Sequence, residues 1–301
     1  MAVSLANGFG LEPSWVRTAL KVVPDAPTIF APQNVQQAML SFGIGNRKVE
    51  ALGSWLRAAS LCDGTPSTLR LTLLGQLIKD QDPNLEDTGT WLIIHLMLAL
   101  SADSSGLRHD LWRWYAGKLF PFGFTMESLR TAAAKDFPDS TARTIRSGLD
   151  EVVKTLRLTP LGSLGFFQED TLSGPEHLCK TPSAPGVITH ALLLAGVARQ
   201  LELSGRDTVN FDELIELESG VARALNLPRS SLTAILDGAP SRFGSHLVAI
   251  TRTAGLDSVW LGERSLLFWL AWHYLGRRNG PRQETETHVR HLLEDYGRLL
   301  V

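Results

Sequence analysis

Apolar residues recur at helical spacing along most of the chain, and three stretches share one arrangement. In each, two helices joined by a turn precede a segment in which polar and apolar residues alternate, as they do in a strand. The first stretch has helices over 32–42 and 46–60 and an alternating segment over 68–73. Gly43 ends the first helix, and Asn46 is expected to cap the second.

The second stretch begins near residue 125. Thr125 is expected to cap a helix that runs through Lys135, and Asp139 or Ser140 to cap a second helix that ends near Leu156. A Pro-Leu-Gly turn and an apolar segment, LGFFQ, follow. This pattern predicts another pair of helices with a small β element behind it.

The third stretch starts with an acidic helix over 211–225. Leu227-Pro228 interrupts it, and proline suits the first turn of the next helix, which is predicted over 229–238. Two short strands are predicted over 247–250 and 258–261.

Together these patterns predict a mainly α fold of tandem winged-helix or helix-turn-helix-like modules with small β wings and bridging helices. A segment rich in Pro, Gly and Ser over 173–186 is read as the main linker. We expect four parts: a first winged-helix-like module with bridging helices over 1–120, a second module over 121–172, a third over 186–262, and C-terminal helices over 263–301.

Composition narrows the class of protein. Of the 301 residues, 44% are hydrophobic and 20% are charged, which is typical of a folded globular chain. Two cysteines are too few for a disulfide framework. The longest apolar runs, 91–100 and 266–275, are half the length that spanning a bilayer needs, and the first residues lack a signal-peptide pattern. These features predict a cytoplasmic protein without a membrane segment.

The formal net charge of -2 means that any nucleic-acid surface must be a local patch. Residues 42–79 hold five basic residues and two acidic ones, and 43–48 is a glycine-rich turn at a helix start, where phosphate can bind. A tight turn and a solvated helix face would produce the same pattern. The DNA-binding candidates of this first patch are Asn46, Arg47, Lys48, Arg57 and Arg70.

Two further basic patches fall in the other modules. Arg143, Lys154 and Arg157 follow one face of the second module's second helix. Arg229 and Arg242 belong to the third module, where pairing with the preceding acidic helix is the alternative to DNA contact.

Carboxylates cluster between residues 80 and 87. Asp82, Glu86 and Asp87 are the catalytic candidates, and Asp82 and Asp87 the ligands for Mg²⁺ or Mn²⁺, because phosphodiester hydrolysis commonly uses carboxylate-held metal ions. The alternative is an acidic turn that caps a helix beginning near Thr88.

Other candidate groups favour structural roles. His95 lies in an apolar helix, where a core histidine is expected. The final helix aligns Glu284, His288, His291 and Asp295, which a solvated face explains better than a metal site. The chain contains no complete nuclease motif, so the residues alone do not establish catalysis.

Several phrases, in order, resemble a prokaryotic family otherwise known only as a domain of unknown function, the SspB-like family of the Ssp DNA phosphorothioation defence system. They are FGIGNRKVEALGSWLRAASL at 42–61, TLLGQLIKDQDPNLEDTGTWLIIHLMLA at 72–99, LDEVVKTL at 149–156 and TRTAGLDSVWL at 251–261. The likeness runs from about residue 8 to 261.

The chain departs from the family in two phrases. Where the family has Gly-His-Glu-Thr-Phe, this chain has Gly10-Leu11-Glu12-Pro13-Ser14, so no role of that histidine carries over. The family's Gly-x-Gly-Lys-Asn is replaced by Gly-Ile-Gly-Asn-Arg at 43–47, which moves the basic residue by one place.

The resemblance implies a DNA-binding subunit that nicks one strand of double-stranded DNA, so that sulfur can enter the backbone. It implies partners in the same system, a cysteine desulfurase and ATPase subunits, and a homodimer is left open. One alternative is a non-catalytic winged-helix adaptor or transcriptional regulator. Another is a protein-interaction scaffold.

Overall fold

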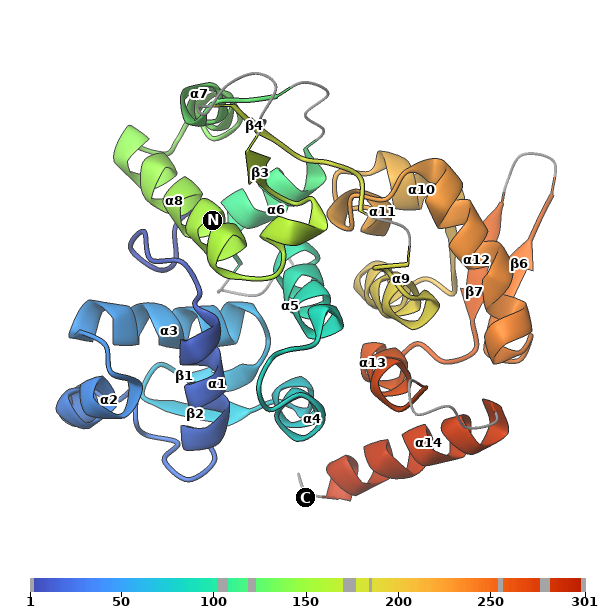
Figure 1. The fold of residues 1–301 in the computed structure, drawn as a ribbon, viewed down its shortest axis with the longest axis horizontal. Coiled ribbons are helices and arrows are strands. Elements are labelled where there is room, and N and C mark those ends of the chain that lie inside the picture. The colour runs from blue at the N-terminus through green and yellow to red at the C-terminus, as the bar shows by residue number, and fades with distance from the viewer. Residues whose placement is uncertain are drawn as a thin grey trace. The chain divides into compact units, whose positions relative to one another are not determined.

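The computed structural model describes residues 3–101, 108–118, 123–169, 177–183, 186–253, 257–276 and 282–298, and they are mainly helical (Figure 1). They form two compact units, Met1–Pro182 and Ser183–Val301. The boundary falls within the predicted linker, of which residues 173–176, 184 and 185 lie outside the described part. The finer division into four parts stays a prediction.

The first unit opens with three α-helices, a short 3₁₀ helix, a hairpin and a fourth α-helix. Their bounds are α1 (Pro13–Val22), the short 3₁₀ helix η1 (Pro32–Asn34), α2 (Val35–Phe42), α3 (Asn46–Ala58), β1 (Cys62–Thr65), β2 (Thr68–Leu71) and α4 (Leu73–Gln81). The strands pair antiparallel, with Cys62 opposite Leu71 and Thr65 opposite Thr68. The predicted helix–turn–helix pattern and the strand after it are therefore present.

The junction between α2 and α3 differs from the prediction in one detail. Gly43 ends α2 with a left-handed φ of 65°, as expected. Asn46, however, is the first residue of α3, and Gly45 occupies the cap position without a side-chain hydrogen bond. The prediction that Asn46 caps this helix was wrong, and its side chain is exposed.

The rest of the first unit is α5 (Thr88–Ala99), α6 (Asp110–Gly117), α7 (Met126–Asp136), α8 (Ala142–Leu158), η2 (Gly162–Leu164), β3 (Gln168–Glu169) and β4 (Leu178–Cys179). Thr125 caps α7, as predicted. Thr141 caps α8 by accepting the Thr144 N–H, so the expected cap at Asp139 or Ser140 was wrong. Threonine is itself a good cap, and three neighbouring cap residues made the start ambiguous.

The second unit contains α9 (His190–Ser204), β5 (Thr208–Asn210), α10 (Phe211–Glu216), α11 (Val221–Ala224), α12 (Arg229–Phe243), β6 (Val248–Thr251), β7 (Ser258–Leu261), α13 (Leu266–Leu275) and α14 (Arg282–Arg298). Its three strands are antiparallel in the order β5-β7-β6. The two strands predicted after residue 246 are therefore present.

Two helices of the second unit differ from the prediction. The acidic helix over 211–225 is divided, because the chain turns back at Gly220, where a β-carbon would lie 2.4 Å from the Leu214 carbonyl oxygen. Helix α12 continues past residue 238 to Phe243 despite Pro240, and this extension buries Ala239 and Phe243 in the core.

The two most apolar helices lie in the interior. Helices α5 and α13 are 12 and 10 residues long, and Trp91 and Trp269 on them are fully buried. Within the described ranges, no helix combines the length and the apolar character needed to cross a membrane.

A buried carboxylate fastens the N-terminal segment to α8. Glu151 is fully buried and accepts hydrogen bonds from the Ser4 hydroxyl (2.5 Å) and from the backbone N–H groups of Leu5 and Gly8 (2.9 Å each). His109 Nε2 lies 3.0 Å from its second oxygen. A buried carboxylate is costly unless it is paired in this way. Glu151 thus holds the N-terminal segment and the start of α6 together.

The same segment links α8 to α3. Gly10 lies so close to α8 that a β-carbon would stand 2.7 Å from the Thr155 nitrogen, and the Leu11 N–H donates to the Thr155 hydroxyl at 2.8 Å. On the other side, the Trp55 indole N–H of α3 donates to the Phe9 carbonyl at 2.9 Å. The position of α3 therefore depends on this segment.

We predict that Glu151→Gln lowers the free energy of unfolding of the first unit by about 1–3 kcal/mol at neutral pH, because the amide offers one acceptor atom where several donors converge. Urea denaturation measures the change. Glu169→Gln, at an exposed site in the same unit, is the matched control and should change stability little.

The effect should depend on pH. Burial raises the pKa of Glu151, but contact with His109 and hydrogen bonds from Ser4 and Gly8 outweigh it and leave the pKa below its ordinary value of 4.5. The stabilisation should be complete above that value and disappear as the pH falls through the lowered pKa of the folded state. An equal difference between wild type and variant at neutral and strongly acidic pH would contradict this account.

Candidate nucleic-acid interface

Helix α3 presents a polar face outward. Asn46, Arg47 and Glu50 are exposed, and Ser54 and Arg57 are half-buried. The opposite face is apolar and buried, through Val49, Leu52 and Leu56 among others. This is the helical phase expected from the sequence.

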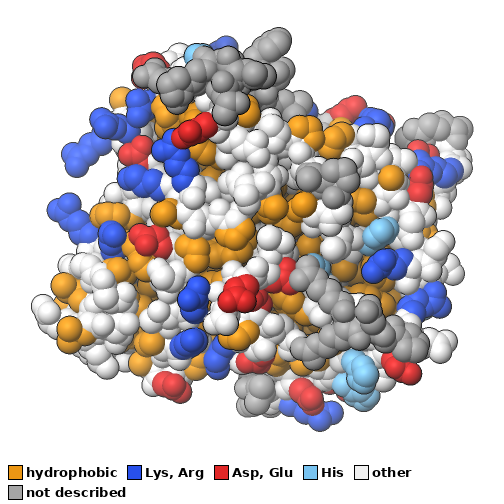
Figure 2. Space-filling view, viewed as in Figure 1, with side chains coloured by type: hydrophobic (Ala, Val, Ile, Leu, Met, Phe, Trp, Pro, Cys, Tyr) orange, Lys and Arg blue, Asp and Glu red, His pale blue; other side chains and the backbone are white. Residues whose placement is uncertain are grey.

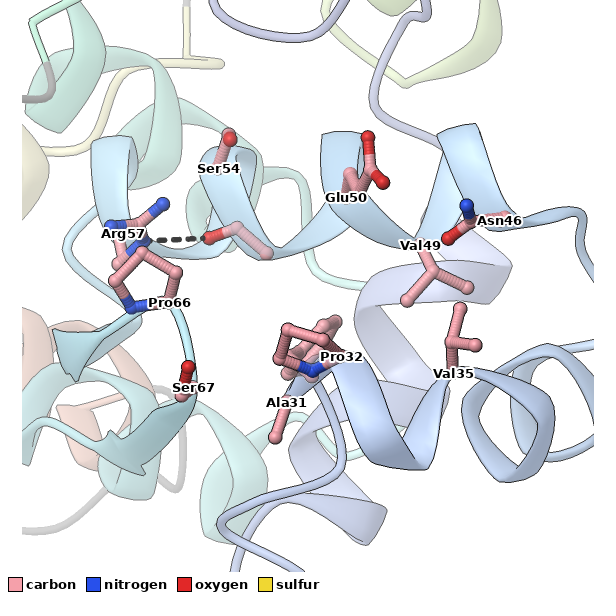
Figure 3. A pocket seen from close by; sticks show the side chains of 12 residues that line it. Ala31, Pro32, Val35, Asn46, Val49, Glu50, Ser54, Arg57, Pro66 and Ser67 are labelled. Atoms are coloured by element: carbon pink, nitrogen blue, oxygen red, sulfur yellow. Dashed lines mark hydrogen bonds between the residues drawn. The ribbon is translucent and has the colours of Figure 1, made fainter.

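A groove runs along α3 and has a volume of about 350 Å³ (Figure 3). One wall is formed by Phe30, Ala31 and Pro32 and by Val35 at the start of α2, and Pro66 and Ser67 of the β1–β2 turn form another. The polar side chains along α3 are Asn46, Glu50, Ser54 and Arg57, and the apolar lining includes Phe30, Pro32, Val35 and Val49. Two of the predicted DNA-binding residues, Asn46 and Arg57, thus line one groove.

Arg57 is a cation without an acidic partner. Its Nε donates to the Gly53 carbonyl at 3.2 Å, and burial lowers the pKa of the guanidinium. Within the described ranges no carboxylate lies in ion-pair distance of Arg57, and its terminal amino groups make no hydrogen bond. A half-buried guanidinium in this state favours an anionic ligand.

The other predicted residues of the first patch separate into two groups. Arg47 and Arg70 are exposed and, among the residues that the structure describes, form no ion pair. Lys48 instead turns toward α1, where its Nζ lies 3.7 Å from a Glu12 oxygen and 4.9 Å from the centre of the Trp15 ring. Lys48 therefore already interacts within the protein.

The second predicted patch lies on α8. Arg143 is exposed at the start of this helix, whereas the Lys154 Nζ donates to the Gly8 carbonyl at 2.7 Å and Arg157 lies 3.9 Å from Glu169. Sequence reasoning missed Arg146, which is exposed one turn after Arg143. The three-residue spacing was a signal that could have found it. Figure 2 shows Lys and Arg side chains gathered over this part of the first unit.

The third predicted patch, in the second unit, contains one internally paired arginine. Arg229 lies 2.6 Å from Asp212 and 3.8 Å from Glu216, both on α10. Arg242, near the end of α12, is exposed and has no ion-pair partner among the described residues. For Arg229 the geometry therefore agrees with the alternative of intramolecular pairing.

The acidic cluster is organised around a turn. Asp82, which is 8% exposed, accepts hydrogen bonds from the Glu86 N–H (2.9 Å), the Asp87 N–H (3.1 Å) and the Thr90 hydroxyl (2.7 Å). Asp87 caps α5 by accepting the Gly89 N–H at 2.7 Å. Both carboxylates thus stabilise the start of α5.

These residues fit a divalent ion poorly. In the described part of the chain, no three His, Cys, Asp or Glu side chains come together as metal ligands would, on the 80–87 turn or on α14. Asp82 points into its own turn rather than toward the neighbouring carboxylates. His95, for its part, is buried and accepts the Trp112 indole N–H at 3.2 Å, as expected of a core histidine.

Comparison with known proteins places the chain in a family. The family described as "Protein of unknown function (DUF4007)" matches residues 6–277. The chain belongs to this family.

Two solved structures share the fold of this DUF4007 chain. A magnesium ion-bound SspB crystal structure has a TM-score of 0.74, and an SspB crystal structure one of 0.73. Each is 19% identical in sequence, and each alignment covers 98% of this chain and 96% of the other. No curated protein sequence matches.

The two phrases in which this chain differs from the SspB-like family, residues 10–14 and 43–47, are linked by an ion pair. Glu12 of the first phrase pairs with Lys48, directly after the second. Leu11, which stands where the resemblance gives a histidine, is fully buried, and its N–H is bonded to Thr155. This position therefore has a packing role here.

We predict a graded loss of stability when the acidic turn is mutated. Asp82→Ala should cost about 1–3 kcal/mol, because it leaves three donors without an acceptor, and Asp87→Ala about 1 kcal/mol as a lost helix cap. Glu86→Ala, at an exposed position, is the control and should change little. Thermal and urea unfolding of the three variants measure the order.

The same experiment with Mg²⁺ or Mn²⁺ tests the metal assignment. If these ions raise the Tm of wild type but not of Asp82→Ala, the turn binds metal and its role is more than structural. Equal melting curves with and without the ions are the expected result.

Proposed function

We propose that this protein is a DNA-binding subunit of a DNA phosphorothioation system and that it binds double-stranded DNA through winged-helix-like modules. The exposed face of α3 carries the proposal, because Arg47 and Arg57 there lack acidic partners among the described residues. Phosphate contacts by such residues supply most of the affinity of DNA-binding proteins.

The order of elements supports a first module over α1 to β2. Three helices followed by an antiparallel hairpin match a winged helix, in which the last helix enters the major groove. Helix α3 is then the recognition helix, and the β1–β2 hairpin, which carries Arg70, is the wing.

The second unit supports another module. Helix α9, strand β5, helices α10 to α12 and the pair β6–β7 follow one another, and the strand order β5-β7-β6 places the first strand beside the last. Helix α12 would be its recognition helix, with Arg242 exposed. The pair α7–α8 with β3–β4 is proposed as the remaining module, with Arg143 as its DNA contact.

The place in a phosphorothioation system rests on the family likeness. The chain shares its fold with SspB, and the sequence resemblance implies nicking of one strand and association with a cysteine desulfurase and ATPase subunits. The nicking part of the proposal rests on this resemblance, because Asp82 and Asp87 are engaged by hydrogen bonds of their own turn, which fits a divalent ion poorly.

A second candidate function is a non-catalytic DNA-binding adaptor. The hydrogen bonds of Asp82 and Asp87 favour the adaptor, since they give both carboxylates a structural role that needs no catalysis. The two candidates share the DNA surface and differ only in strand cleavage.

We predict that Arg47→Ala and Arg70→Ala each weaken binding to duplex DNA and reduce the salt slope of log K by about 1, as expected for the loss of one phosphate contact. Fluorescence anisotropy at several salt concentrations measures both. Arg206→Ala, which removes an arginine already paired with Glu213 at 2.8 Å, is the matched control. Wild-type salt slopes in both test variants would show that α3 and the β1–β2 hairpin are not the DNA interface.

Plasmid relaxation separates the two candidates. If the protein is a nickase, supercoiled plasmid should become open circular with Mg²⁺ or Mn²⁺ and stay supercoiled with chelator. Nicking by folded Asp82→Asn and Asp87→Asn variants then tests whether the 80–87 turn is the active site, and loss of nicking in both would assign it there. Full nicking by both would place the active site elsewhere, and an intact plasmid under every condition would leave the adaptor function.

A further inference from the structure

The groove beside α3 combines three kinds of surface. Arg57 lies at the end near the β1–β2 turn, Asn46 lies at the opposite end, and the lining between them is largely apolar (Figure 3). Contacts to the phosphates of a duplex need no apolar groove of this kind.

Charge defines the first part. The Nε of Arg57 is held by the Gly53 carbonyl at 3.2 Å, which fixes the side chain and leaves the two terminal amino groups available. Because these groups have no acceptor or counterion within the described ranges, the site is complementary to an anion. A phosphate group suits the planar fork of a guanidinium.

An aromatic ring defines the second part. Phe30 is half-buried in the groove and stacks on Phe42, with ring centres 5.4 Å apart and planes at 20°. Phe30 packs closely on α3 at Gly53, where a β-carbon would lie 3.3 Å from the ring, so this contact holds Phe30 in the wall of the groove and leaves no room for a base between Phe30 and Gly53. Pro32 and Pro66 add flat apolar walls. These surfaces suit a planar ring system.

Polar groups define the third part. Asn46 and Glu50 are exposed at the rim, and Glu50 has no cationic partner among the described residues. Seven residues separate Glu50 from Arg57, which is about 10 Å along a helix. An amide and a carboxylate at this distance from a phosphate site can accept hydrogen bonds from the edge of a base.

We propose that this groove binds one unpaired nucleotide of a DNA strand, with its phosphate at Arg57 and its base against Phe30, read by Asn46 and Glu50. The inference rests on the proposed function and adds that the groove binds a nucleotide whose base is unpaired. A base inside a duplex is stacked on both faces, so it reaches such a groove only from a single strand or after it leaves the stack.

The test compares a single-stranded oligonucleotide with a duplex of the same sequence, by fluorescence anisotropy. Arg57→Ala removes the proposed phosphate site, and Ser54→Phe fills the groove from its rim. Both should weaken single-strand binding by at least about fivefold, as loss of base stacking does. Duplex binding should weaken less, because the duplex is also held by Arg47 and Arg70 outside the groove. Arg47→Ala, outside the groove, is the matched control and should weaken both DNA forms to a similar extent.

A 2-aminopurine probe gives an independent reading. The probe is placed at a mismatch in the duplex. Its fluorescence should change when wild-type protein is added and should not change when folded Ser54→Phe is added. Equal loss of single-strand and duplex binding in the groove variants, or wild-type single-strand binding by both, would overturn this inference and leave the proposed function standing. Failure of the wild-type protein to bind either DNA form would overturn the proposed function itself.

Discussion

The buried carboxylate of Glu151 is the interaction on which the first unit depends. It collects donors from Ser4, Leu5 and Gly8 and contacts His109, so that the N-terminal segment, α6 and α8 meet at one charge. The segment held in this way supplies the carbonyl that Trp55 of α3 binds. The orientation of the proposed DNA-reading helix thus depends on an acid that makes no contribution to the surface.

Local patterns in the sequence predicted much of the fold. The spacing of apolar residues predicted the buried face of α3, and the alternation of polar and apolar residues predicted β2. Both signals come from residues that are close together in the chain. The break at Gly220 and the buried state of Glu151 were not predictable, since they depend on Leu214 folding back and on a segment more than 140 residues away. Long-range contacts of this kind leave no periodic signal.

The candidate site shows the same division. Sequence reasoning predicted Asn46 and Arg57, but the groove that gives them a shared role forms only when residues 30–35 and the Pro66–Ser67 turn meet α3. Charge patterning also could not separate Arg47, which has no described partner, from Lys48, which pairs with Glu12. At the acidic turn, hydrogen bonding to N–H groups explains Asp82 and Asp87 without a metal. The structure therefore supports DNA recognition more directly than DNA cleavage.

Hydrogen–deuterium exchange with and without duplex DNA tests this account most directly, because it locates the interface without mutation. Bound DNA should slow exchange in α3 and in the β1–β2 hairpin, over residues 46–71, and leave α4 and the 80–87 turn unchanged. Saturating DNA that leaves 46–71 unprotected while protecting another surface would contradict the central claim that α3 is the DNA-reading helix.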